Sequence, residues 1–106
     1  MELIVGNVFV RVNKMAEAGD IVHGHKHNFD HMTLIVRGKV HIRAIKPDGE
    51  KIERVFKAGE FCLILANVEH EITALMDDTL FHCIYSHRTP QGDVVEKYTG
   101  WADAYV

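Results

Sequence analysis

Histidine is the most unusual feature of this 106-residue sequence. Four of its eight histidines lie between Val22 and Met32. Neutral imidazole is the commonest side-chain ligand for transition metals and accepts Mn, Fe, Ni, Co, Cu and Zn. The cluster therefore indicates a metal site as the chemistry to look for first.

The spacing of four histidines suggests how such a site would be built. His25 and His27 are two residues apart, so in an extended strand both imidazoles would point to one face. His31 follows four residues later, at the start of the next expected strand. His70 begins a strand about forty residues downstream, so only a fold that packs strands together would bring it to the others. The alternative is a polar strand face or hydrogen-bonded core histidines.

Hydrophobic residues alternate with period two along most of the chain, which predicts strands that would position these histidines. Turn residues separate the apolar stretches, as at Pro47-Asp48-Gly49 and Ala58-Gly59-Glu60. Short strands at this spacing are typical of a sandwich or barrel. The expected strands are 3–15 (broken at 6–7), 31–37, 40–45, 51–56, 61–66, 70–76 and 79–86.

The tail, 93–106, has a different pattern. Tyr98, Trp101 and Tyr105 recur at helical spacing, although Gly100 disfavours a stable helix. We expect a short arm packed on the domain or on a neighbouring subunit. An aromatic box facing a substrate is the alternative.

Composition excludes several classes of function. The formal net charge is −3, so no basic surplus exists to neutralise phosphates, and we expect no nucleic-acid partner. No apolar run reaches the roughly 20 residues of a membrane span, and the first residues lack the positive charge of a signal peptide. We expect one domain over 1–106, located in the cytoplasm and away from membranes. Cys62 and Cys83 cannot form a disulfide framework and are expected to be buried as apolar-like residues.

The histidine region resembles the first motif of the cupin superfamily, G-x5-H-x-H-x3-4-E-x6-G. The chain reads Gly19-x5-His25-x-His27-x3-His31-x6-Gly38, which agrees at every position except one. The glutamate of the motif is His31 here. Agreement of several glycine and histidine spacings at once makes this motif the stronger of the two resemblances.

The second cupin motif, G-x5-P-x-G-x2-H-x3-N, is similar to Gly59-x5-Leu65-x-Asn67-x2-His70-x3-Ala74. Its first glycine and its histidine are kept in register, while proline, the second glycine and asparagine are replaced. Because asparagine tolerates the left-handed conformation better than most residues, the tight turn at Asn67 should survive.

The resemblance implies an all-β, antiparallel jelly-roll (cupin) β-barrel of six to eight strands. It also implies one divalent transition metal per chain, with His25, His27, His31 and His70 as ligands. Mn or Fe is favoured, and Ni, Co, Cu and Zn are alternatives. Small cupins are often dimers, so a homodimer that binds a small-molecule ligand or substrate is expected.

Other histidines have less defined roles. His23 and His82 are candidates for contacts just beyond the ligands, and ordinary surface or hydrogen-bonded positions are the alternative. With His70 pointing inward, Glu69 and Glu71 should point outward, while Ile72 and Ala74 should continue the inward face. The expected interior therefore lacks a carboxylate base.

Replacement of the motif glutamate by His31 removes a negative charge from the ligand set, so a bound ion should be a stronger Lewis acid. We expect an oxygenase-type enzyme acting on a small oxygen-chelating organic substrate. A metal-dependent isomerase or lyase, and a non-catalytic metal- and ligand-binding cupin, are the alternatives. Dioxygen consumption and the geometry of the metal would distinguish them.

Overall fold

The computed structural model describes residues 2–88 and 91–93, which form nine strands and no helix. Within these ranges there is accordingly no helix that could span a membrane. The strands are β1 (Glu2–Val5), β2 (Val8–Met15), β3 (Ile21–His25), β4 (His31–Arg37), β5 (Lys39–Ile45), β6 (Lys51–Lys57), β7 (Phe61–Ile64), β8 (Glu69–Ala74) and β9 (Thr79–Ser86).

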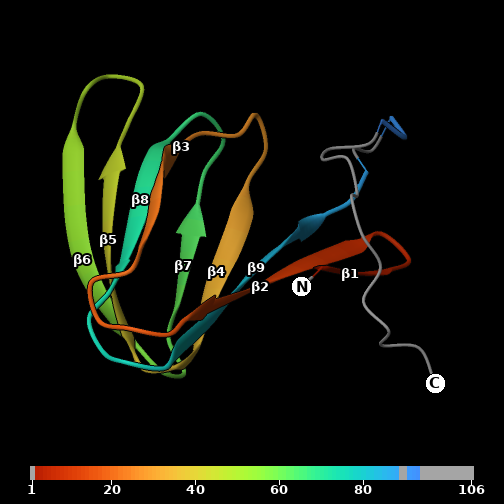
Figure 1. The fold of residues 1–106 in the computed structure, drawn as a ribbon. Coiled ribbons are helices and arrows are strands. Elements are labelled where there is room, and N and C mark those ends of the chain that lie inside the picture. The colour runs from red at the N-terminus through yellow and green to blue at the C-terminus, as the bar shows by residue number, and fades with distance from the viewer. Residues whose placement is uncertain (1, 89–90, 94–106) are drawn as a thin grey trace.

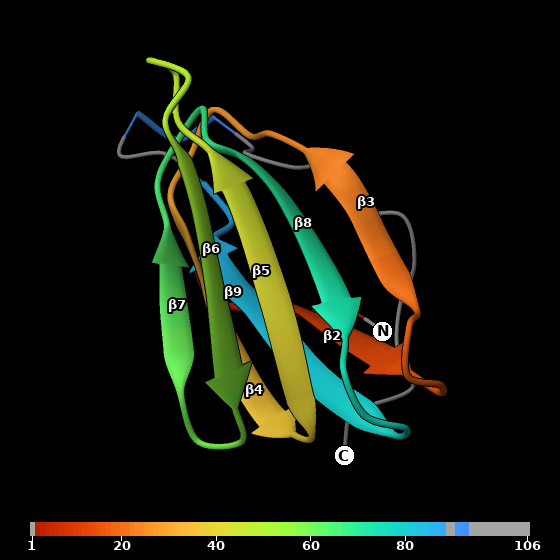
Figure 2. The ribbon, with the colours of Figure 1, turned by 90° about the vertical axis from the view of Figure 1, so that its left-hand side faces the viewer.

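The strands form two antiparallel sheets that face each other (Figures 1 and 2). One sheet has the order β1-β2-β9-β4-β7, and the other has the order β3-β8-β5-β6. The prediction of an all-β antiparallel fold is confirmed. In the described part of the chain, no strand pairing joins the two sheets, so the predicted barrel is an open sandwich. On its open side lie the edge strands β6 and β7, one from each sheet.

Turn residues end the strands where the sequence predicted. Gly6-Asn7 separates β1 from β2, and Gly38 separates β4 from β5. Gly38 has a φ of +84°, and a Cβ there would lie 2.3 Å from the Thr79 hydroxyl oxygen. Only glycine fits where the chain passes from one sheet to the other.

The prediction that one strand carries both His25 and His27 is wrong. β3 ends at His25, after an irregularity between Val22 and His25, and His27 lies in the loop that follows. The carbonyl of His27 accepts a 2.6 Å hydrogen bond from the Asn67 amide instead of pairing in a sheet. The chain must leave the four-stranded sheet here to reach β4 in the other sheet, so regular strand pairing cannot continue.

The core lies between the inner faces of the two sheets. Alternate residues of β8 point inward, as predicted, because His70, Ile72 and Ala74 are all buried. The buried apolar cluster consists of Met15, Ile35, Val40, Ile42, Ile72, Ala74 and Phe81. It separates the two ends of the inter-sheet space, which differ in chemistry. The predicted aromatic arm at 94–106 lies outside the described residues.

Candidate metal centre

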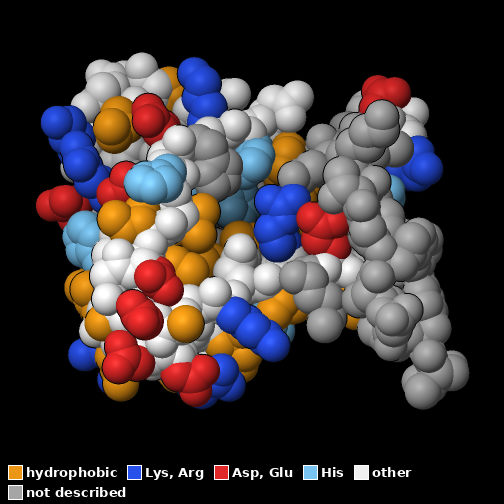
Figure 3. Space-filling model, viewed as in Figure 1, with side chains coloured by type: hydrophobic (Ala, Val, Ile, Leu, Met, Phe, Trp, Pro, Cys, Tyr) orange, Lys and Arg blue, Asp and Glu red, His pale blue; other side chains and the backbone are white. Residues whose placement is uncertain are grey.

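Three histidines from three different elements meet between the sheets. His27 comes from the β3–β4 loop, His31 from the first position of β4 and His70 from β8. One imidazole nitrogen from each lies within 4.8 Å of the others. The fold thus joins the predicted strand histidines His31 and His70 across the two sheets, with His27 added from the loop. Figure 3 shows histidine side chains gathered near the upper middle of one face.

The position of His70 fixes which of its nitrogens faces the other histidines. Its Nδ1 lies 3.0 Å from the carbonyl oxygen of Val68. A carbonyl can only accept, so Nδ1 is the donor, and in the neutral imidazole Nε2 then keeps its lone pair. Metal-binding histidines commonly donate their second nitrogen to a carbonyl in this way, which orients the ring.

The loop that carries His27 is tied to the turn before His70. The Asn67 amide donates to the His27 carbonyl at 2.6 Å, and the Ala66 amide donates to Asp30 Oδ1 at 2.7 Å. Asn67 has a φ of +64°, which confirms the expected left-handed turn. The two hydrogen bonds hold the segment with His27 against the segment with His70.

His25 is the fourth residue of the predicted ligand set. It is the last residue of β3, and its backbone pairs with that of His70, which keeps the two α-carbons about 5 Å apart. Its side chain lies outside what the structure describes, so its role as a ligand stays a prediction.

His23 and His82 were predicted as contacts beyond the ligands. His23 is exposed and is not among the residues that line the histidine cavity. His82 alternates along β9 with Phe81 and Cys83, which do line that cavity, so it lies on the opposite face of the sheet. The structure does not bring either residue into the cluster.

Aromatic rings pack around the cluster. The Phe29 ring stacks on His27 with centroids 4.7 Å apart, and it contacts Tyr85 at the same distance. Tyr85 stacks in turn on Phe9 at 4.7 Å and lies edge-on to His31 at 6.2 Å. These rings screen the imidazoles from water and restrict their orientation.

Arg11 and Asn13, two polar residues of β2, line the same cavity and were missed by sequence reasoning. Their strand reads Val8, Val10 and Val12 on one face, a pattern that suggests these valines as the core face. In the structure the alternate residues Arg11 and Asn13 line the histidine cavity. The signal that could have identified Arg11 is its spacing from Asn13, two residues along the strand, which places both polar side chains on one face.

The histidine cavity is lined by one positively charged side chain and by no negatively charged one among the described residues. Arg11 pairs with Glu2 at 3.2 Å, yet none of the described residues that line the cavity is acidic. Glu69, next to His70, is exposed as predicted, and Glu71 is only half-buried. Among the described residues, the cavity lining therefore offers imidazoles, one guanidinium, one amide, one thiol and one tyrosine hydroxyl, but no carboxylate base.

The donor set fits a transition metal. Nitrogen ligands sit about 2.1 Å from a metal, which places neighbouring ligand atoms about 3 Å apart. The three histidine nitrogens lie within 4.8 Å of one another, which is close to the spacing of ligand atoms around one ion. The whole cavity, about 30 Å³ with no ion in it, has room for an ion or for one or two water-sized groups.

Comparison with known proteins identifies the fold. No protein-family model matches the sequence, and no curated protein is significantly similar to it. Solved structures do match, among them oxalate decarboxylase from Bacillus subtilis at pH 4.6, with a TM-score of 0.71 and 15% identity over 81% of this chain. A second structure of the same enzyme, from work on its Mn(II) centres, matches with a TM-score of 0.70 and 16% identity over 76% of this chain.

The matches cover only part of the larger enzyme. This chain spans 23% and 21% of the length of those two decarboxylase chains. At this level of identity the likeness shows the fold, which is that of a cupin domain, in agreement with the resemblance of the two sequence motifs. The activity of the decarboxylase does not follow from it.

Proposed function

We propose that this protein is a metal-dependent cupin enzyme of the oxygenase type, acting on a small organic acid that chelates through oxygen. The observation that carries the proposal is the group of three imidazole nitrogens within 4.8 Å between the sheets. His70 supports it further, since its bond to Val68 leaves Nε2 directed to ligation.

Each residue of the site has a task in this proposal. His27, His31 and His70 hold one divalent ion, with Mn or Fe favoured, and His25 supplies a fourth nitrogen. A bound ion would supply Lewis acidity and open positions for substrate oxygen or dioxygen. The aromatic packing on His27 and His31 keeps bulk water out.

Arg11 selects the substrate by charge. Its guanidinium lines the cavity and is paired with Glu2 at 3.2 Å, so a substrate carboxylate would share the guanidinium with Glu2 or displace it. Guanidinium groups bind carboxylates through two parallel hydrogen bonds.

A metal-dependent isomerase or lyase is a second candidate because of Tyr85. That reaction needs a group that carries a proton. Tyr85 is 8% exposed, lines the cavity and lies beside His31, so its hydroxyl is the candidate carrier. Dioxygen consumption separates the two reactions.

The test is dioxygen uptake by protein loaded with Mn(II) or Fe(II), using small dicarboxylates, diketones, enediols and catechols. We expect uptake with at least one compound and an about tenfold or larger rise in KM for acids in Arg11→Gln, as for loss of a charged hydrogen bond. Arg37→Gln is the matched control, because Arg37 pairs with Asp78 outside the cavity. Turnover without dioxygen consumption would favour the isomerase or lyase, and no turnover of any compound would contradict an enzyme of either kind.

A further inference from the structure

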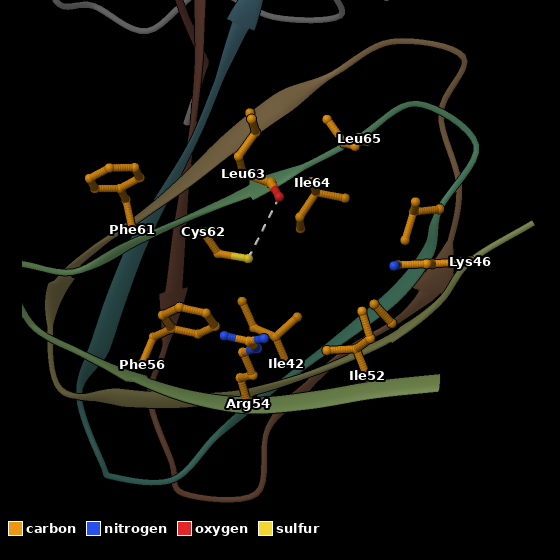
Figure 4. Close-up of a pocket in the computed structure, with 12 residues that line it drawn as sticks. Ile42, Lys46, Ile52, Arg54, Phe56, Phe61, Cys62, Leu63, Ile64 and Leu65 are labelled. Atoms are coloured by element: carbon orange, nitrogen blue, oxygen red, sulfur yellow. Dashed lines mark hydrogen bonds between the residues drawn. The ribbon is translucent and has the colours of Figure 1, made fainter. Parts of the chain in front are cut away.

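A second and larger cavity lies on the open side of the sandwich, between β6 and β7. Its volume is about 360 Å³, which is within the range of about 300–1,000 Å³ typical of small-molecule sites. Figure 4 shows Cys62 and Ile64 of β7 pointing toward Ile42 and Phe56 on the facing sheet. The lining consists of Ile42, Ala44, Lys46, Ile52, Arg54, Phe56, Phe61, Cys62, Leu63, Ile64, Leu65 and Val68.

This cavity is separate from the candidate metal centre. None of the residues that line it also lines the histidine cavity. Thr33, fully buried on β4, lies between the two, because its backbone pairs with Cys62 on one side and with Cys83 on the other. A molecule bound in the larger cavity would therefore contact neither Arg11 nor the histidines.

Arg54 is the charged group that this cavity presents. It pairs across the strands with Ile42, which pairs with buried Ile72, so Arg54 lies on the inner face of its sheet. Its guanidinium is near enough to Cys62 to act on the thiol electrostatically. Among residues 2–88 and 91–93 no carboxylate forms an ion pair with Arg54.

The other cation of the lining is already compensated. Lys46 Nζ lies 3.2 Å from Glu50 Oε2. No acidic residue lines the cavity. The cavity thus combines an apolar body with the guanidinium of Arg54, which is exposed to water at the open side and forms no ion pair with a described carboxylate.

We propose that the cavity between β6 and β7 binds an aliphatic carboxylate of medium chain length, with its chain between the sheets and its carboxylate on Arg54. The apolar lining matches the chain, and the guanidinium matches the carboxylate in charge and in geometry. A neutral molecule of the same shape would fill the cavity but leave Arg54 without a counter-charge.

Arg54 also has a structural alternative. An inward-pointing charge on an edge strand discourages a second sheet from pairing there, and β6 is an edge strand. In that case Arg54→Gln would change self-association and leave ligand binding unaffected. The two roles therefore predict different experimental outcomes.

The test is calorimetric titration of the full chain with hexanoate, octanoate and octan-1-ol. We expect octanoate to bind more tightly than hexanoate by about fourfold per methylene, and more tightly than octan-1-ol. Arg54→Gln should weaken octanoate binding about tenfold or more and leave octan-1-ol binding unchanged. Lys51→Gln is the matched control, since Lys51 lies on the same strand but on the opposite face.

The location of binding needs its own control. The variant His27→Ala/His70→Ala should keep octanoate affinity, which separates this site from the candidate metal centre and from the proposed activity. Loss of binding in Arg11→Gln but not in Arg54→Gln would overturn the proposal. Equal affinity for octanoate and octan-1-ol would also overturn it. So would the absence of octanoate binding together with a change of oligomeric state in Arg54→Gln, measured by light scattering.

Discussion

The two ends of the inter-sheet space are built from the same pair of sheets but differ in size and chemistry. The histidine end is small, about 30 Å³, and is lined by imidazoles, Arg11 and aromatic rings. The β6–β7 end is about 360 Å³ and mostly apolar. The buried apolar cluster and Thr33 lie between them.

The difference follows from how each end is closed. At the histidine end, one backbone hydrogen bond joins the loop with His27 to the turn with Asn67, and a second bond joins the Ala66 amide to the Asp30 side chain, so the two connections between the sheets are held together there. At the other end, β6 and β7 are the edges of different sheets, and no strand pairing joins them. A fold of this kind can thus hold rigid ligands at one end and leave an open cavity at the other.

The largest expected effect comes from Gly38→Ala, which should disturb both ends together. A Cβ at Gly38 would lie 2.3 Å from the Thr79 hydroxyl oxygen and 2.9 Å from its Cα. With the positive φ, this should lower the free energy of unfolding by about 3 kcal/mol or more. Gly49→Ala is the control, because Gly49 has a similar φ but nothing within 4 Å. It should cost about 1 kcal/mol. Thermal unfolding measures both, and equal losses would contradict the steric argument.

Asp30→Ala should affect the histidine end alone. It removes the acceptor of the Ala66 amide and so loosens the loop that carries His27. Loss of a group that supports a ligand typically weakens metal affinity 10- to 100-fold, and we expect about tenfold, measured by competition with a chelator. Asp48→Ala removes an equivalent bond, to the Glu50 amide, and Asp48 lines neither cavity. It should leave metal affinity unchanged, and an equal loss in both variants would refute the role of the loop.

The reactivity of the Cys62 thiol tests the environment of the cavity between β6 and β7. Burial raises its pKa, and the Arg54 guanidinium partly opposes that rise. Because the pKa of the Cys62 thiol is raised by folding, the protonated thiol contributes to the free energy of unfolding. This contribution is complete at neutral pH and is lost as the pH rises through the raised pKa. In a Cys83→Ala background, Cys62 should therefore alkylate more slowly at pH 8.5 than a free thiol, and Arg54→Gln should slow it further. Faster alkylation in Arg54→Gln would place Arg54 away from the thiol.

The fold was largely predictable because alternation and turn residues agree over most of the chain. The predicted bounds of β4 and β9 match the structure, since the turn residue Gly38 follows β4 and the turn residues Asp77-Asp78 precede β9. The loop after His25 was not predicted, because the hydrogen bond that holds His27 comes from Asn67, forty residues away. Local periodicity carries no information about such a partner.

The candidate site was predictable where it depends on motif spacing and not where it depends on which face of a strand is buried. His31 and His70 lie in the cluster as expected. Arg11 was missed because β2 presents three valines on the face away from the histidines, so its alternation suggests the wrong core face. Strand parity can be settled only by what packs against each face.

Metal content tests the central claim most directly. Plasma mass spectrometry of untagged protein should find about one transition metal ion per chain, and none in His27→Ala/His70→Ala. The control His41→Ala should retain the metal, because His41 contacts Glu53 and does not belong to the histidine cluster. Equal metal content in wild type and the double variant, or no metal in either, would contradict the claim that these histidines form a metal centre.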